Sequence, residues 1–61
     1  MKISEMVRYV KKHGCKLLYH GTRHDVWINP KTGGRTEIPR HRSKELPTGT
    51  ANQILEDLGL K

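Results

Sequence analysis

Two stretches of apolar residues with helical spacing lie at opposite ends of this 61-residue chain, and they constrain its fold more than any other feature. Apolar residues at positions i, i+3, i+4 and i+7 line one face of a helix. The two stripes are Ile3, Met6, Val7 and Val10, and Ala51, Ile54, Leu55 and Leu58. Because each stripe must be shielded from water, we expect the segment between them to supply a surface that both helices cover.

Local signals place the ends of both predicted helices. Ser4 is a suitable N-cap, and the first helix is expected to run from about Ser4 to His13. Thr50 opens a capping-box pattern for the second helix, whereas Pro47 favours an earlier start. Gly59 can adopt the left-handed conformation that commonly ends a helix, so the second helix is expected to stop there.

Three short segments between the helices have strand character, at residues 15–20, 24–29 and 35–38. In the first segment the side chains alternate with a period near two, and we expect Cys15, Leu17 and Tyr19 to face inward. Short connections rich in turn residues join the three segments, which favours antiparallel pairing. The sequence therefore predicts an α+β fold of order α-β-β-β-α, with two helices on one face of a three-stranded antiparallel sheet.

The composition limits the size of the core and the setting of the protein. Because 33% of the residues are hydrophobic and none is Phe, residues 1–61 are expected to form one small domain. Cys15 is the only cysteine, so an internal disulfide is impossible and a reducing compartment is favoured. The longest apolar runs are three residues, and the N-terminus lacks the apolar stretch of a signal peptide. We expect a cytoplasmic protein with no membrane contact.

The chain is basic, and its charge is unevenly distributed. The formal net charge is +6, and residues 1–44 carry eleven of the twelve Lys and Arg residues but three of the six Asp and Glu residues. Such an excess favours a polyanionic partner such as RNA. The alternative is a basic surface that is merely solvated.

A histidine at the start of the second predicted strand is the main candidate for chemistry. Residues 21–27 read Gly-Thr-Arg-His-Asp-Val-Trp, with His24 at their centre. A histidine has an unperturbed pKa of about 6.5 and can transfer protons near neutral pH. Gly21 would let a phosphate approach the backbone, and Arg23 would bind it. His24 shares the parity of Val26, so it would face the helices if Val26 does, and a polar residue without function is the alternative.

A second histidine lies in the most basic run of the chain, residues 39–44. This run follows the third predicted strand, whose pairing with the second is expected to bring His41 toward His24. Phosphodiester cleavage needs a base and an acid, which two histidines would supply. The side chains of the run that we expect to bind RNA phosphates are Arg40, Arg42 and Lys44. A solvated basic loop is the alternative.

Trp27 has the opposite parity to Val26. If Val26 faces the helices, Trp27 lies on the other face of the sheet, where it would stack on an RNA base. Packing in the core is the alternative for so large an aromatic side chain.

Metal ligation is not favoured by the spacing of the ligand-type residues. The four potential zinc ligands close together in the sequence are His13, Cys15, His20 and His24. Their spacing does not match the short zinc motifs, and Cys15 and His20 fall on opposite faces of one predicted strand. The acidic residues show no cluster suited to magnesium. We therefore expect no metal and no other cofactor.

Several segments, taken in order, resemble the HicA toxins. They are Lys-His-Gly at 12–14, the 21–27 segment, Ile-Pro-Arg-His-Arg at 38–42, and the closing residues 49–60. The resemblance implies a fold like that of a double-stranded-RNA-binding domain and an mRNA interferase of a toxin-antitoxin pair. It also implies metal-independent RNA cleavage, with His24 matching the family's catalytic histidine, and inhibition by a HicB antitoxin. The sequence departs from the family's common Gly-Ser-His arrangement by placing Thr22 and Arg23 between Gly21 and His24.

Two functions of other classes compete with this expectation. A module that binds double-stranded RNA without cutting it would usually carry lysines at the start of its last helix, where residues 47–50 read Pro-Thr-Gly-Thr. A structural protein of a ribonucleoprotein particle would explain the charge but would leave His24 without a role. In each case the expected partner is RNA, and for a toxin also an antitoxin protein, with no direct binding of DNA.

Overall fold

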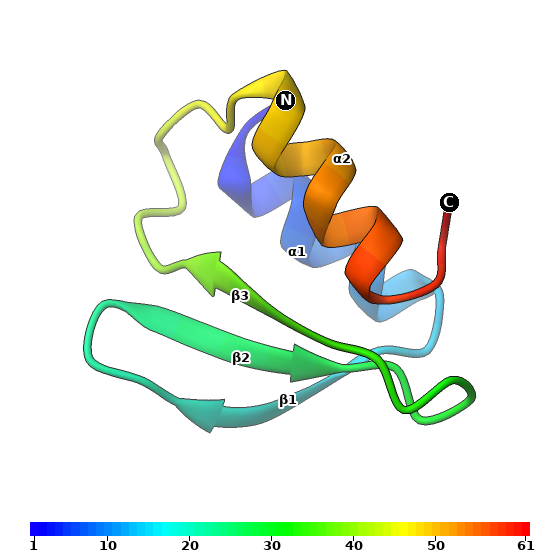
Figure 1. The fold of residues 1–61 in the computed structure, drawn as a ribbon. Coiled ribbons are helices and arrows are strands. Elements are labelled where there is room, and N and C mark those ends of the chain that lie inside the picture. The colour runs from blue at the N-terminus through cyan, green and yellow to red at the C-terminus, as the bar shows by residue number, and fades with distance from the viewer.

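The computed structural model describes residues 1–61 and contains five elements, in the predicted order (Figure 1). They are α1 (Ile3–Lys12), β1 (Lys16–His20), β2 (His24–Ile28), β3 (Arg35–Pro39) and α2 (Thr48–Asp57). The strands form one antiparallel sheet in the order β1-β2-β3, and both helices lie on the same side of it (Figure 1). The predicted α+β architecture is confirmed. None of its helices has the length and apolar character needed to cross a bilayer.

Helix α1 buries the stripe that the sequence indicated, but it begins one residue earlier than predicted. Met6 and Val10 are fully buried. The N-cap is Lys2 rather than Ser4, and the Lys2 backbone N–H donates a 2.7 Å hydrogen bond to the Glu5 carboxylate. This carboxylate satisfies a backbone donor and also lies at the positive end of the helix dipole, so Ser4 is not needed as a cap.

Helix α2 follows the earlier of the two starts that the sequence allowed, directly after Pro47. Its buried side chains are Ile54 and Leu58 at its C-terminal end. Gly59 has a φ of 69°, and the Leu60 N–H donates to the Leu55 carbonyl at 2.8 Å. This Schellman ending satisfies carbonyls that a helix otherwise leaves without partners.

The residues of β2 and β3 alternate between two faces of the sheet. Asp25 pairs with Ile38 and Trp27 with Thr36, and these four residues are buried beneath the helices. Val26 pairs with Glu37 on the other face, which carries no helix and is called the open face below. Trp27, only 3% exposed, belongs to the core cluster. The expectation that Trp27 lies on the open face is therefore wrong, and the core alternative is correct.

Strand β1 is an edge strand, and all five of its residues are exposed. A bulge shifts its register, because Leu17 pairs with Trp27 whereas Tyr19 pairs with Val26. The bulge reverses the alternation and turns Tyr19 to the open face. The prediction that Cys15, Leu17 and Tyr19 all face inward is thus wrong for Tyr19, which is 55% exposed. Leu17 shares the helix-covered face with its partner Trp27, although it is 41% exposed at the edge of the sheet.

The segment that follows β3, residues 40–46 (the basic loop), is fastened to the N-terminus of the chain. The Ile3 N–H donates to the Lys44 carbonyl at 3.0 Å, and the Ser4 N–H donates to the Arg42 carbonyl at 3.1 Å. The Met1 ammonium lies 2.7 Å from the Glu45 carboxylate. These bonds use backbone donors at the start of α1 that have no partner inside the helix. The basic loop therefore has a defined path beside the first turn of α1.

Candidate functional site

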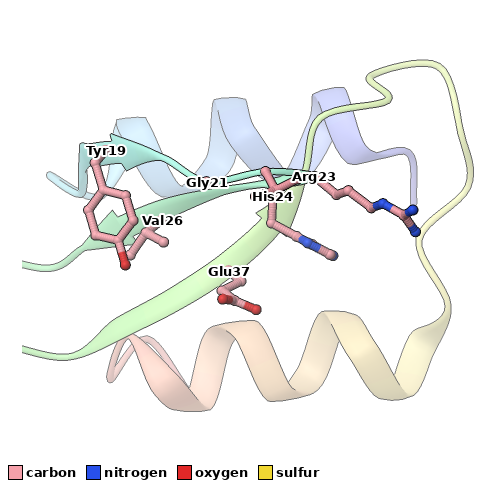
Figure 2. Close-up of a pocket in the computed structure, with 7 residues that line it drawn as sticks. Tyr19, Gly21, Arg23, His24, Val26 and Glu37 are labelled. Carbon is pink, nitrogen blue, oxygen red and sulfur yellow. The ribbon is translucent and has the colours of Figure 1, made fainter.

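His24 begins β2 and its side chain lies on the open face, together with those of Tyr19, Val26 and Glu37 (Figure 2). These side chains line one hollow with residues of the β1–β2 turn. The sequence left open whether His24 and Val26, which share one face of β2, point toward the helices. Asp25 and Trp27 are the residues that face the helices, so His24 points to the open face. His24 is exposed and therefore accessible to a ligand on this face.

His41 lies at a second hollow that His24 shares. Its lining residues are Thr22, Arg23, His24, Pro39, Arg40 and His41. His24 and Pro39 are partners in the β2–β3 register, so the chain that continues from Pro39 passes close to the His24 turn. The expectation that strand pairing brings His41 toward His24 agrees with this arrangement. Two histidines and two arginines at one hollow can supply proton transfer and positive charge to a phosphodiester.

The connection between β1 and β2 is a tight turn over residues 21–24 (the His24 turn). The Gly21 N–H donates a 2.7 Å hydrogen bond to the His24 carbonyl. A Cβ atom added to Gly21 would lie 2.8 Å from that carbonyl oxygen, closer than real Cβ atoms come. The His24 carbonyl thus occupies the direction that a side chain at Gly21 would take, whereas Gly21 itself lines the hollow beside His24, and the approach of a phosphate to its backbone stays a prediction. Glycine at this position permits the tight turn that precedes His24.

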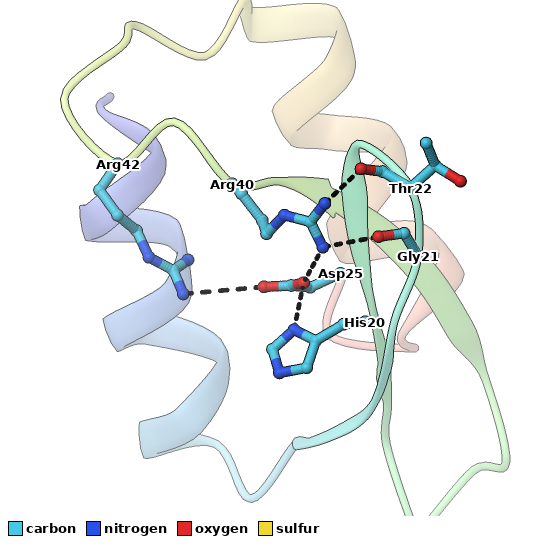
Figure 3. A network of polar contacts seen from close by, with 6 residues as sticks. All are labelled: His20, Gly21, Thr22, Asp25, Arg40 and Arg42. Carbon is cyan, nitrogen blue, oxygen red and sulfur yellow. Dashed lines mark hydrogen bonds and ion pairs between the residues drawn. The ribbon is translucent and has the colours of Figure 1, made fainter.

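A buried carboxylate organises the other side of the His24 turn (Figure 3). Asp25 is only 2% exposed, and it accepts hydrogen bonds from His20 Nδ1 at 2.7 Å and from Arg40 Nη1 at 3.2 Å. Arg42 Nη2 lies 3.9 Å from its second oxygen. Burial by itself would raise the pKa of Asp25, but the hydrogen bonds and charges of His20 and Arg40 outweigh burial and hold this pKa below its usual value.

Arg40 connects the basic loop to the His24 turn (Figure 3). Besides its bond to Asp25, its Nη1 donates to the Gly21 carbonyl at 2.6 Å, and its Nη2 donates to the Thr22 carbonyl. One guanidinium thus contacts three acceptors in or beside the turn. Sequence reasoning placed Arg40 among the residues that bind phosphate and did not find this network. The alternation of β2, which puts Asp25 on the same face as Trp27, is the signal in the sequence that pointed to a buried carboxylate needing partners.

The remaining predicted RNA contacts are on the surface, and among them only Arg23 lines the two hollows. Arg23, Arg42 and Lys44 are all exposed. The backbone bonds between the basic loop and α1 fix the paths from which Arg42 and Lys44 project. Trp27 is separated from this surface by the sheet. Of the predicted RNA-binding residues, Arg23 and Arg40 lie at the hollow of the two histidines, Arg42 lies near Asp25, and Trp27 is in the core.

The potential metal ligands do not gather into a site. No three of the histidine, cysteine, aspartate and glutamate side chains are arranged so that they could hold a metal ion. Among the four residues considered for zinc, His20 is bonded to Asp25 and Cys15 is buried in the core. Burial raises the pKa of the Cys15 thiol, which keeps it in the neutral form that binds metals poorly.

Comparison with known proteins assigns the chain to a family. The model of the family described as "HicA toxin of bacterial toxin-antitoxin" matches residues 3–60. The chain is also 40% identical, over 62 aligned positions that cover both sequences completely, to a protein of Photorhabdus laumondii subsp. laumondii named "Probable mRNA interferase HicA 2". No solved structure matches the chain. The chain belongs to the HicA family of bacterial toxin-antitoxin toxins.

Proposed function

We propose that this protein is a metal-independent mRNA interferase, in which His24 transfers a proton during cleavage of the RNA backbone. The observation that carries the proposal is the shared hollow of His24 and His41, bordered by Arg23 and Arg40. Membership in the HicA family and the name of the Photorhabdus relative support the same activity. The site joins the residue types that phosphodiester cleavage requires, namely two groups for proton transfer and cations for the phosphate.

The proposed reaction is attack of the ribose 2′-oxygen on the adjacent phosphorus. The 2′-hydroxyl loses its proton to a base, the bond from phosphorus to the 5′-oxygen breaks, and this oxygen receives a proton from an acid. His24 takes one of these roles, and His41 is the candidate for the other. The Arg23 guanidinium stabilises the charge that develops on the phosphate oxygens.

The RNA is proposed to follow the open face past His24 and onto the basic loop. Arg23, Arg42 and Lys44 would contact its phosphates, because Arg23 lines the two hollows and the other two are exposed on the basic loop beyond His41. Trp27 is not part of this surface, since it is buried beneath α1 and α2. The contacts of Arg40 are mainly internal, with the Gly21 carbonyl and the Asp25 carboxylate.

The test of this function is a cleavage assay with purified protein in the presence of a chelator. We expect RNA oligonucleotides to be cut at the same rate with and without EDTA, and DNA of the same sequence to resist because it lacks the 2′-oxygen. Loss of activity in EDTA that magnesium or zinc restores would contradict metal independence. Cleavage of single-stranded DNA would contradict attack by the 2′-oxygen.

A non-catalytic RNA-binding module is the competing function. The first turn of α2 follows Pro47 and contains no basic residue, which disfavours the grip on duplex RNA that such modules use. The same assay distinguishes the two functions. Binding of RNA by folded, purified protein without any cleavage would establish the module and overturn the proposed enzyme.

The proposed protein partner is a HicB antitoxin that covers His24 and the surrounding basic surface. The chain carries a net charge of +6, so an acidic partner would be drawn to the same surface as RNA. RNA and antitoxin would then exclude each other. A His24→Ala variant loaded with labelled RNA should release it when titrated with a purified HicB antitoxin. Simultaneous binding of both without mutual weakening would contradict occlusion.

A further inference from the structure

We propose that Arg40 is a positioning residue that holds the His24 turn in place, and that it acts through the backbone of the turn and not on an RNA phosphate. This inference rests on the proposed function of His24. It differs from the prediction made from the sequence, in which Arg40 belonged to the phosphate-binding residues. The reason for the different assignment is that the Arg40 guanidinium is occupied by acceptors of the protein itself.

The hydrogen bonds of the His24 turn leave one carbonyl for Arg40. In a closed two-residue hairpin, the N–H of His24 would donate to the carbonyl of Gly21, in addition to the bond in the reverse direction. Here only the bond from the Gly21 N–H to the His24 carbonyl is made. The Gly21 carbonyl accepts instead from Arg40 Nη1 at 2.6 Å. Arg40 therefore replaces a hydrogen bond that the turn itself does not form.

The backbone of the turn explains why it needs this support. Two-residue hairpins usually adopt type I′ or II′ turns, which require a positive φ at one or both central residues and match the twist of the strands. Neither central residue, Thr22 or Arg23, has a positive φ. A turn of another type tends to splay its strands, and here one of these strands is the exposed edge β1. The Arg40 guanidinium joins the carbonyls of Gly21 and Thr22 and so opposes that tendency.

Asp25 and His20 hold Arg40 in this position. The Asp25 carboxylate accepts from the same Nη1 that bonds the Gly21 carbonyl, and it is itself oriented by His20 on β1. Its negative charge lies 3.2 Å from Nη1 and compensates the charge of Arg40 locally. Arg40 is thus expected to add less to the attraction of RNA than the exposed Arg23 does, although both line the hollow of His24 and His41.

The matched variants Arg40→Lys and Arg8→Lys test the inference, because each keeps its positive charge. Lysine carries a single ammonium and cannot reproduce the planar fork that reaches two carbonyls and a carboxylate. We expect Arg40→Lys to lower kcat by about 10 to 100 fold, since small displacements of a reacting group are costly, while KM and the salt dependence of RNA binding stay as in wild type. Arg8→Lys, at an exposed position of α1 outside the site, should leave kcat unchanged. A wild-type kcat in Arg40→Lys, or a loss confined to KM, would overturn the inference.

Two further measurements separate positioning from a general loss of structure. In the His24→Ala background, Arg40→Lys should cause no further loss of activity, because the side chain that Arg40 positions is absent. A further loss as large as the one that Arg40→Lys causes in wild type would contradict the inference. Hydrogen exchange of the Gly21 amide should also be faster in Arg40→Lys, while the amides of α1 exchange as in wild type. Equal acceleration throughout the protein would show that Arg40 supports only global stability.

The exchange measurement also keeps this inference distinct from the proposed function. If wild-type protein does not cleave RNA, the proposed function fails, yet the Gly21 amide still reports whether Arg40 holds the turn. If Arg40→Lys does not fold, Asp25→Asn releases the same guanidinium from its other side and should accelerate exchange at Gly21 in the same way. Unchanged exchange in that variant would overturn the inference.

Discussion

His24 and Pro39 are register partners across β2 and β3, and this pairing places His41, two residues after Pro39, at the hollow that His24 lines. A pairing shifted by two residues would carry His41 about two strand rises away, roughly 7 Å, which is beyond the reach of one phosphodiester. The strand register is therefore the feature of the fold on which a two-histidine mechanism depends.

The identity of the second proton-transfer group is testable, because Glu37 also lines a hollow with His24. We predict that His41→Ala lowers kcat by about 10² to 10⁴ fold, as removal of a general acid or base does. Glu37→Gln should retain kcat and bind RNA more tightly, since it removes a negative charge from the RNA surface. The reverse pattern in steady-state kinetics would assign the role to Glu37.

Gly21 and Gly49 form a matched pair for substitution by alanine. A Cβ on Gly21 would lie 2.8 Å from the His24 carbonyl oxygen, whereas one on Gly49, in the first turn of α2, meets no atom within 4 Å. We predict that Gly21→Ala displaces the His24 turn and lowers kcat at least 10-fold. Gly49→Ala should keep full activity and stabilise the fold by about 0.5 to 1 kcal/mol. Cleavage rates and thermal unfolding of the two variants test these predictions. Full activity of Gly21→Ala would contradict the dependence of catalysis on the tight turn.

The network around Asp25 predicts how stability depends on pH. Because the folded-state pKa of Asp25 lies below its ordinary value of 3.8, the contribution of its carboxylate to stability is present above that pH and is lost as the pH falls through the folded-state pKa. Asp25→Asn should cost roughly 1 to 3 kcal/mol at neutral pH, where charge-assisted hydrogen bonds are lost. Below pH 3.8 the difference between variant and wild type should shrink.

The comparison of Asp25→Asn with wild type also controls for the titration of the other acidic groups. A hydrogen bond from the Met1 ammonium lowers the pKa of Glu45, which therefore titrates in the same range in both proteins. The difference in unfolding free energy between wild type and Asp25→Asn, measured by denaturant unfolding at several pH values, isolates the contribution of Asp25 to stability. A difference that stays constant down to strongly acidic pH would contradict the lowered pKa.

The basic surface predicts the salt dependence of RNA binding. Arg23, Arg42 and Lys44 are exposed on the His24 turn and the basic loop, and each phosphate contact that is removed should reduce the slope of log K against log salt by about 0.7 for single-stranded RNA. Lys61→Gln, at the C-terminus, should leave the slope unchanged. If the triple variant at Arg23, Arg42 and Lys44 kept the wild-type slope, the RNA surface would have to be sought on Lys11, Lys12 and Lys16.

The sequence predicted the helices and the order of elements because their signals are local. Apolar residues at helical spacing identified α1 and α2, and the Schellman ending at Gly59 could be predicted from residues adjacent in sequence. The faces of the strands were harder to predict. Val26 and Trp27 are adjacent and both buried, so hydrophobicity did not show which of them faces the helices. In β1 a bulge that no local residue announced reversed the alternation before Tyr19.

The candidate site was predictable only in part, for a similar reason. His24 and His41 stand in recognisable turn and basic segments, and the strand order brings them together. The Asp25 network depends on contacts over longer separations, since Arg40 is fifteen residues from Asp25 in sequence. Charge alone suggested phosphate binding for Arg40, because the acceptors that occupy its guanidinium are backbone carbonyls, which no residue type reveals.

The most direct test of proton transfer by His24 is the rate of RNA cleavage by purified His24→Ala protein at saturating RNA in EDTA. His24 is exposed at the start of β2 and makes no side-chain hydrogen bond, so its removal should leave the thermal unfolding temperature close to that of wild type. We predict a cleavage rate about 10² to 10⁴ fold below that of wild type, with RNA still bound. A folded His24→Ala protein that cleaves RNA at the wild-type rate would contradict it.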